Sequence, residues 1–157
     1  MPTFLPPDPP SSRERCELCR EAGGTLVFQS ERWRVIRAAD ASFPAFYRLI
    51  WRAHVAEWSD LGAADRTTAM EAVTAVERAL RDALAPTKIN LASLGNVVAH
   101  LHWHVIARFD WDSRFPAPVW AAAVRDVDPP AAARLSVGLE ELDARVARAV
   151  AALAPAA

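Results

Sequence analysis

The fold of this chain is decided by the segment Ala99-His100-Leu101-His102-Trp103-His104-Val105-Ile106-Ala107-Arg108-Phe109. Its histidines alternate with apolar, aromatic or β-branched residues, which is the pattern of a half-buried strand. Successive side chains of a strand point to opposite faces. The alternation therefore predicts that His100, His102 and His104 share one face, with apolar side chains packed behind them.

Three imidazoles on one strand face, spaced about 6.5–7 Å apart, can act together on one small anionic group or metal ion. The alternative for each ring taken singly is a core or solvated histidine satisfied by a hydrogen bond. Three titratable rings on one apolar strand cost stability unless they are used. The pattern therefore favours a functional site, in which a neutral ring can attack phosphorus while a neighbouring imidazolium neutralises phosphate oxygens.

Length and composition indicate a single globular domain. The 157 residues are enough to bury a core without disulfides. A formal net charge of -1, without a basic stripe, argues against a general nucleic-acid binder. Apolar runs stay well short of the ~20 residues that span a bilayer, and the N-terminus does not show a signal-peptide pattern. We therefore expect a cytoplasmic protein without a membrane partner.

Five prolines lie within the first twelve residues. Because proline lacks an amide donor, residues 1–12 are expected to form a mobile tail. We expect residues 13–157 to form one domain, with its core over about 16–109 and an aromatic and proline-rich segment plus a helix over 110–157.

The two cysteines lie close together in Cys16-Glu17-Leu18-Cys19, just before Gly23-Gly24. This spacing lets two thiolates reach one Zn²⁺ from a tight turn. A redox pair is disfavoured because the motif does not lie between a strand and a helix. Two small buried hydrophobic residues remain the other interpretation.

Hydrophobic periodicity predicts the other elements. Strands are expected over 25–28, 33–38, 46–51 and 88–93, with a turn at 40–44 in which Asp40 is well suited to capping. Helices are expected over 60–85, ended by Pro86, and over 137–153. These elements predict an α+β fold: an antiparallel sheet of about five strands, a long helix packed on one face, and a C-terminal helix.

Residues 109–120 are rich in aromatic residues and proline, and they are too irregular for a helix. Trp111, Phe115 and Trp120 offer two interpretations. They lie over the site and stack on a base, or they cover the core or a subunit contact.

The run His100-Leu101-His102-Trp103-His104-Val105-Ile106 resembles the signature of the histidine triad (HIT) family: three histidines separated by single apolar residues, then two more apolar residues. The resemblance implies a HIT-like fold over about 16–109 and a homodimer with a continuous sheet. It also implies a hydrolase or transferase whose small-molecule substrates are dinucleoside polyphosphates or nucleoside phosphoramidates.

The resemblance further implies a role for each histidine of the triad. His102 is the nucleophile, which attacks the α-phosphorus and forms a nucleotidyl-histidine that water hydrolyses. His104 binds the α-phosphate oxygens and helps the leaving group, and His100 orients the strand. This chemistry requires no cofactor.

The segment Trp51-Arg52-Ala53-His54-Val55 resembles the corresponding part of zinc-containing family members. In those proteins the ligands correspond to Cys16, Cys19, His54 and His100. Two cysteines with two histidines form a closed set, which is typical of a structural rather than a catalytic zinc. The alternative is a metal-free fold in which His54 is a surface residue.

Four polar residues are implied to contact the substrate: Asp40, Asn90, Asn96 and Arg108. Asp40 corresponds to a ribose contact, and a hairpin of 88–93 with the triad strand is expected to bring Asn90 and Asn96 near the histidines. The family usually has Gly-Gln-Ser/Thr-Val before the triad, whereas this chain has Gly95-Asn96-Val97-Val98. Val97 thus replaces a hydroxyl that helps to hold the phosphate and leaving group.

Two other classes of function remain open. The first is a nucleotide-binding regulatory or adaptor module with little turnover, which the replacement at Val97 favours. The second is a zinc-binding structural protein whose histidines are all ligands or spares.

Overall fold

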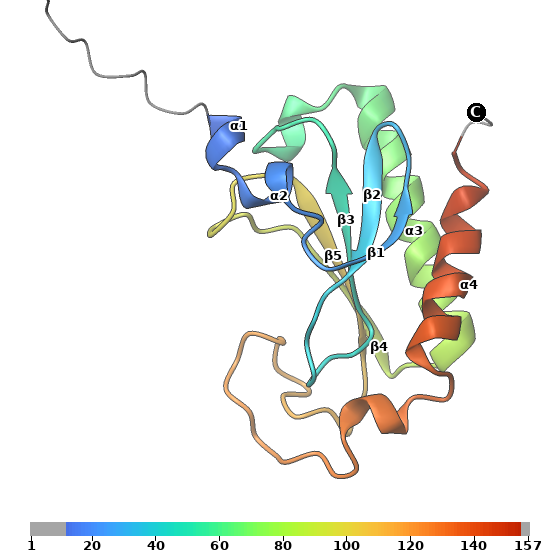
Figure 1. The fold of residues 1–157 in the computed structure, drawn as a ribbon. Coiled ribbons are helices and arrows are strands. Elements are labelled where there is room, and N and C mark those ends of the chain that lie inside the picture. Colours follow the sequence, from blue (N-terminus) through green and yellow to red (C-terminus); the bar gives the residue numbers. More distant parts are fainter. Residues whose placement is uncertain (1–11, 155–157) are drawn as a thin grey trace, which may run out of the picture.

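The computed structural model describes residues 12–154, which form a five-stranded antiparallel sheet with long helices on one face and short helices and loops on the other (Figure 1). The predicted α+β fold is confirmed. Residues 1–11 of the expected tail lie outside the described residues, and Ser12 begins the first helix. The elements are α1 (Ser12–Arg15), α2 (Glu17–Arg20), β1 (Thr25–Gln29), β2 (Trp33–Arg37), β3 (Phe46–Trp51), η1 (Trp58–Asp60), α3 (Ala63–Leu84), β4 (Lys88–Ala92), β5 (His102–Arg108), η2 (Ala131–Arg134) and α4 (Leu139–Ala151).

The strand that carries the triad lies inside the sheet. The strand order is β1-β2-β3-β5-β4, and all neighbouring pairs are antiparallel. β5 therefore pairs with β3 on one side and β4 on the other, so its backbone donors and acceptors have partners on both sides. In this register His102 lies opposite Ile50, and His104 lies between Arg48 and Ala92.

The strand that carries the triad begins later than the alternating pattern predicts. β5 begins at His102, so His100 precedes it. The reason is that the partner strand β3 ends at Trp51. Leu101 then bonds through its carbonyl to the Trp51 N–H and through its own N–H to the carbonyl of Val55, in the loop beyond. The chain still follows β3 at this point, but regular pairing has stopped.

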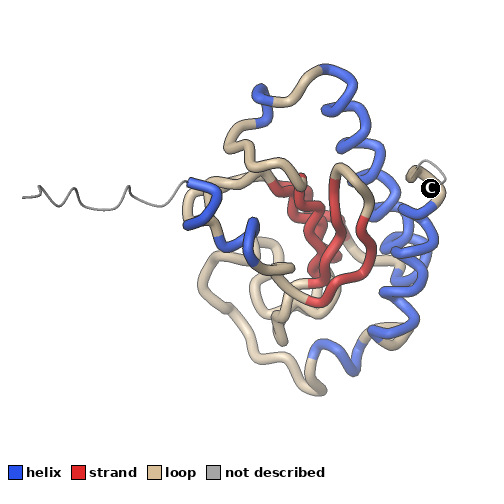
Figure 2. The backbone as a smooth tube through the Cα atoms, turned by 45° about the horizontal axis from the view of Figure 1, so that its top comes forward, coloured by secondary structure: helices blue, strands red, loops and turns tan. Residues whose placement is uncertain are grey.

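Alternation along β5 separates two cores. Leu101, Trp103 and Val105 face the long helices, as expected. The helical layer contributes a stripe of buried side chains from both helices: Val73, Val76 and Leu80 of α3, with Leu142, Val146 and Val150 of α4. Figure 2 shows these helices together on one side of the strands. α3 begins three residues later than expected, since Trp58–Asp60 forms a separate 3₁₀ turn.

The opposite face of the sheet, which we call the site face, carries His102, His104 and Ile106. Its second, smaller core is covered by short or irregular segments rather than by long helices (Figure 1). The covering side chains come from α2 and the residue before it, the turn before β3 and the aromatic segment: Cys16, Leu18, Phe43 and Val119. Among the described residues, no helix has the length and apolarity that crossing a bilayer requires.

A buried ion pair ties the aromatic and proline-rich segment to the end of β5. Arg108 donates to both carboxylate oxygens of Asp112, at 2.8 and 3.1 Å, and the two side chains are 1% and 2% exposed. Arg108 also donates to the carbonyl of Ala117, at 2.8 Å. Asp112 accepts the backbone N–H groups of Arg114 and Phe115, at 2.9 and 2.7 Å. Segment 109–120 is therefore held by side-chain contacts, chiefly those of Arg108 and Asp112, rather than by a helix or strand.

We predict that Asp112→Asn lowers the free energy of unfolding by about 3 kcal/mol, because it leaves a buried guanidinium without its counter-charge. Burial opposes ionisation of Asp112, but hydrogen bonds from Arg108 and the Arg114 N–H outweigh it and lower the carboxyl pKa. A lowered folded-state pKa contributes stability that is complete above the ordinary value of 3.8 and is lost as pH falls through the folded value.

Urea unfolding from pH 7 to 3 checks this prediction. The wild type should lose more stability than Asp112→Asn between pH 4 and 3. Asp110→Asn, an exposed change in the same loop, is the matched control and should behave like the wild type. Equal pH profiles for wild type and Asp112→Asn would contradict the assignment.

Candidate active site and metal cluster

His102 and His104 lie side by side on the site face of β5. Their ring centres are 4.9 Å apart, and the ring planes stand at 89°. The side chains are buried, with exposed fractions of 9% and 5%. The predicted common face is therefore observed for these two rings.

A backbone hydrogen bond sets the state of the His102 ring. Its Nδ1 lies 2.6 Å from the carbonyl oxygen of His100, which can only accept a hydrogen bond. Nδ1 therefore carries the hydrogen, and Nε2 keeps its lone pair. Burial lowers the pKa of His102, the bond to His100 opposes this, and the charge of Arg48 lowers the pKa further. The ring is thus neutral, with a nucleophilic nitrogen.

The His104 ring is held by packing. It meets Phe46 and Trp120 edge-on, at ring-centre distances of 5.3 and 5.2 Å. Within residues 12–154 its buried Nδ1 has no hydrogen-bond partner. Burial, followed by the charges of His102 and Arg48, lowers the pKa of His104 to about 3. The positive charge expected of a neighbouring imidazolium is therefore absent near neutral pH.

The third ring of the triad points into a different group of residues. His100 Nδ1 lies 3.3 Å from Cys16 Sγ and 3.4 Å from Cys19 Sγ. His54 Nδ1 lies 3.4 Å from Cys19 Sγ. All four ligand atoms lie within 4.8 Å of one another, although they come from α2 and the residue before it, the loop after β3 and the segment before β5.

This cluster fits a tetrahedral metal ion. Zinc with Zn–S near 2.3 Å and Zn–N near 2.0 Å places sulfur and nitrogen about 3.5 Å apart, close to the distances here. His100 Nε2 lies 2.6 Å from the Trp51 carbonyl, so this nitrogen carries the hydrogen and Nδ1 presents a lone pair to the thiols. Burial and the adjacent Cys16 raise the pKa of Cys19, as expected for paired thiols without a cation between them.

Arg34 of β2 supports the cysteine turn, a role that the sequence analysis missed. Its guanidinium donates to three backbone carbonyls around the turn, those of Leu18, Glu21 and Ala22, at 2.7, 2.9 and 3.1 Å. The sequence could not indicate this role, because the carbonyls that Arg34 contacts belong to a turn that only the fold brings beside β2. Ser93 was missed for the same reason: its hydroxyl donates to the carbonyl of His102, at 2.8 Å, and supports the start of β5.

The four predicted substrate contacts lie in different environments. Asp40 is exposed, and its Oδ1 accepts the N–H groups of Ser42 and Phe43, which is the turn-capping role. Asn90 lies on the site face, where its Oδ1 accepts from Arg108, at 2.8 Å. Asn96 is exposed in the loop between β4 and β5.

Arg108 requires a correction. We expected its side chain to contact substrate, but it is 1% exposed, and all three of its nitrogens donate to Asp112, Asn90 or Ala117. Its charge is neutralised inside the protein, so it positions Asn90 and the aromatic segment instead.

Trp120 places part of the aromatic segment beside the site. It is 55% exposed and touches His104. Trp111 instead stacks on Phe109 at a ring-centre distance of 4.7 Å, and Phe115 packs near the guanidinium of Arg108. Within this segment Trp120 therefore lies beside the site, whereas Trp111 and Phe115 are used in packing.

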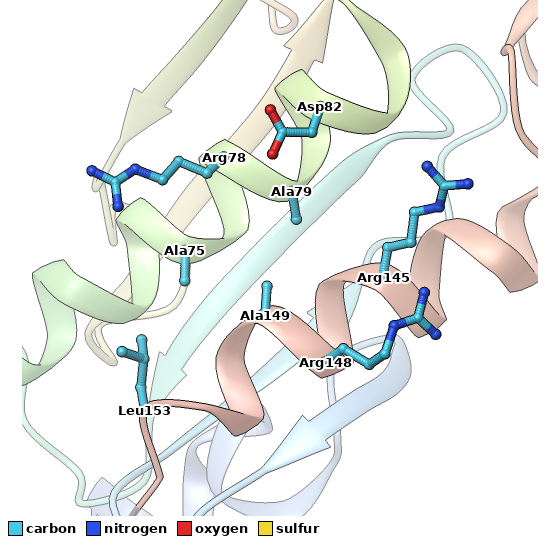
Figure 3. Close-up of a pocket in the computed structure, with 8 residues that line it drawn as sticks. All are labelled: Ala75, Arg78, Ala79, Asp82, Arg145, Arg148, Ala149 and Leu153. Carbon is cyan, nitrogen blue, oxygen red and sulfur yellow. The ribbon is translucent and has the colours of Figure 1, made fainter.

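Two surface grooves differ in their relation to the histidines. One, of about 590 Å³, runs along β4 and is lined by Asn90, Pro118 and Trp120, among others. The other, of about 440 Å³, lies between α3 and α4, where Ala75 and Ala79 face Ala149 (Figure 3). The second groove belongs to the helical layer, on the other side of the sheet from His102 and His104.

Comparisons with known proteins agree with this fold and site. A model of the HIT domain matches residues 20–111, more than half of the chain. The chain therefore belongs to the HIT family, as the triad indicated. A direct comparison with curated proteins finds no match.

Solved structures of histidine triad proteins share the fold. One from Bradyrhizobium japonicum is 26% identical, with a TM-score of 0.66, over 82% of this chain and 92% of that one. One from Sinorhizobium meliloti is 26% identical, with a TM-score of 0.62, over 83% and 90%. A Zn-bound family member from Mycobacterium smegmatis is 19% identical, with a TM-score of 0.57, over 90% and 96%.

Proposed function

We propose that this protein is a nucleotide hydrolase or transferase that acts at the α-phosphate of dinucleoside polyphosphates or nucleoside phosphoramidates. The observation that carries the proposal is the hydrogen bond from His102 Nδ1 to the His100 carbonyl, which leaves Nε2 as a lone-pair donor beside His104. Membership of the HIT family supports the same chemistry.

The proposed reaction has two steps at phosphorus. In the first, His102 Nε2 forms a bond to the α-phosphorus, and the bond to the leaving group breaks with its electron pair going to that group. In the second step, water attacks the phosphorus and releases a proton to the solvent. The P–N bond breaks with its electron pair returning to Nε2, which restores the neutral ring. The unpartnered Nδ1 of His104 offers a hydrogen-bonding site for the phosphate or leaving group.

We propose that the cluster of Cys16, Cys19, His54 and His100 holds a structural zinc. The ligand distances and the state of the His100 ring support this, and a Zn-bound protein shares the fold. Bound there, zinc would supply a rigid cross-link between the N-terminal turn and the segment before β5. Because the His100 carbonyl accepts the hydrogen bond from His102 Nδ1, this cross-link would also position the nucleophile.

The nucleoside part of the substrate is proposed to lie beside Trp120. This indole is exposed, touches His104 and borders the groove along β4, so it offers a π-face to a base. Asn90 borders the same groove. Asp40 and Asn96 are exposed and remain proposed contacts for the ribose and the phosphate side.

A nucleotide-binding adaptor is the second candidate function. It is favoured by Val97, which is 96% exposed and offers no hydroxyl where the family usually has one, and by the small exposed fraction of both histidines. Calorimetry that shows tight binding of a nucleoside monophosphate, together with no hydrolysis of any conjugate, would select the adaptor. The alternative in which every histidine is a metal ligand is disfavoured, because His102 and His104 lie outside the cluster found among the described residues.

The homodimer and the cytoplasmic location also remain proposals. β4 is an outer strand of the sheet, and Leu91 and Leu94 at this edge are 41% and 54% exposed. An outer strand with exposed apolar side chains is suited to pairing with a second copy of the chain.

We predict that His102→Ala lowers the turnover of diadenosine tetraphosphate by at least about 10⁴-fold, because the bond-forming nitrogen is lost. The measurement is nucleotide release, with products identified by mass. Asp110→Asn is the control and should keep the wild-type rate. Circular dichroism checks the fold of both variants, and wild-type rates in a folded His102→Ala protein would refute the mechanism.

We also predict one zinc per chain, lost when Cys16 and Cys19 are both changed to serine. Loss of the cross-link should lower the unfolding midpoint by about 4–8 °C. Metal analysis and thermal unfolding give the two readouts. His104→Ala is the matched control and should keep its zinc, since its ring lies outside the cluster. Full zinc content in the double-serine variant would contradict the assignment.

A further inference from the structure

Arg48 is a charged side chain at the centre of the site face. It lies on β3 between the buried residues Phe46 and Ile50, directly opposite His104 on β5 and Ile36 on β2. Its guanidinium carbon is 5.2 Å from the centre of the Phe46 ring, which itself packs against His104. A cation among such neighbours costs stability unless another group compensates it.

The other strand arginines of this face are compensated. Arg34 donates to three carbonyls around the cysteine turn, and Arg108 is paired with Asp112. Within residues 12–154, the half-buried side chain of Arg48 makes no hydrogen bond or ion pair, and its Nε is buried without a partner. The charges of Glu17 and Asp40 act on Arg48, but neither carboxylate lies within ion-pair distance.

Arg48 is the cation that lies beside the histidines of the site. It is directly opposite His104 in the register of β3 with β5, and the ring centres of His104 and His102 are 4.9 Å apart. Val97, with its exposed apolar side chain, provides no hydroxyl. An anion beside these rings would find its counter-charge in Arg48.

We propose that Arg48 binds the oxygens of the substrate's phosphoryl group beside His104. This assignment rests on the proposed function, since it gives the same site its phosphate-binding residue. A guanidinium presents several N–H donors in a planar fork that matches two phosphate oxygens. Its charge stabilises the negative charge on the phosphoryl oxygens when the His102 nitrogen attacks.

The alternation of β3 shows why this residue is distinctive. Phe46, Arg48 and Ile50 point to one face, and an apolar side chain at the middle position would complete the second core. The arginine instead leaves a buried donor unsatisfied. Such a local conflict between sequence and packing is expected at functional sites.

The test compares the binding of adenosine monophosphate and adenosine by calorimetry. These probes share the nucleoside and differ in the phosphate, so the ratio of their affinities reports the phosphate contact. We expect the wild type to prefer the monophosphate by about tenfold or more. Arg48→Met should bring the ratio close to one, and Arg48→Lys, which keeps the charge, should retain part of the preference.

Arg52→Met is the matched control. Arg52 is exposed just after β3, and its substitution by methionine removes the same charge. Its side chain donates to the carbonyls of Ser30 and Glu31, in the turn between β1 and β2. Its affinity ratio should equal that of the wild type. Thermal unfolding gives an independent readout, because Arg48→Met removes an uncompensated charge and should leave the midpoint unchanged or raise it.

The outcomes separate this assignment from the proposed function. An unchanged affinity ratio in Arg48→Met, or a wild type that binds both probes equally, overturns the role of Arg48. Loss of turnover in His102→Ala would in that case still support the hydrolase. Conversely, a ratio that depends on Arg48 in a protein without turnover supports the phosphate contact and points to the adaptor. A lowered midpoint with an unchanged ratio shows a purely structural arginine.

Discussion

The site depends on the hydrogen bond between His102 Nδ1 and the carbonyl of His100. This bond selects the tautomer of His102, and it connects the ring to the segment whose own side chain enters the cysteine cluster. One residue thus serves two neighbours, with its carbonyl directed at the candidate nucleophile and its imidazole at the candidate metal. A shift of His100 would alter both. The hydrogen bond of its Nε2 to the Trp51 carbonyl restrains the ring within the segment.

The alternation of side chains along β5 places the main core and the candidate site on opposite faces of the sheet. Side chains at odd positions of β5 enter the large core under α3 and α4, whereas His102 and His104 lie on the other face. Helical packing therefore supplies most of the apolar burial without occupying the site. The site face is covered by short segments that polar contacts hold in place: α2 by Arg34, and the aromatic segment by Arg108 and Asp112. Such segments can border a ligand while the sheet beneath them remains rigid.

Three arginines on the site face show that a residue type does not determine a role. Arg34 satisfies backbone carbonyls, and Arg108 forms a buried ion pair, so both are internal supports. Arg48 lies between them, and among residues 12–154 its buried Nε has no hydrogen-bond partner. Their partners, rather than their identity or position along a strand, distinguish support from binding. The physical reason is that a desolvated guanidinium is stable only when acceptors meet its donors.

The sequence by itself determined the five strands and the two long helices, because their apolar periodicity is local: 3.6 residues in α3 and two in β5. The short helices α1 and α2 carry no such period and were not predicted. It also determined the family, through the triad, and the candidate ligands, through Cys16, Cys19, His54 and His100. Only the tertiary structure decided where β5 begins, since that depends on where its partner strand ends. It also placed Arg108 among internal partners, gave Arg34 and Ser93 their supporting contacts, and left the Nε of Arg48 without a partner among the described residues. Those roles depend on which groups distant segments bring within hydrogen-bonding distance, and local sequence patterns carry no information about such encounters.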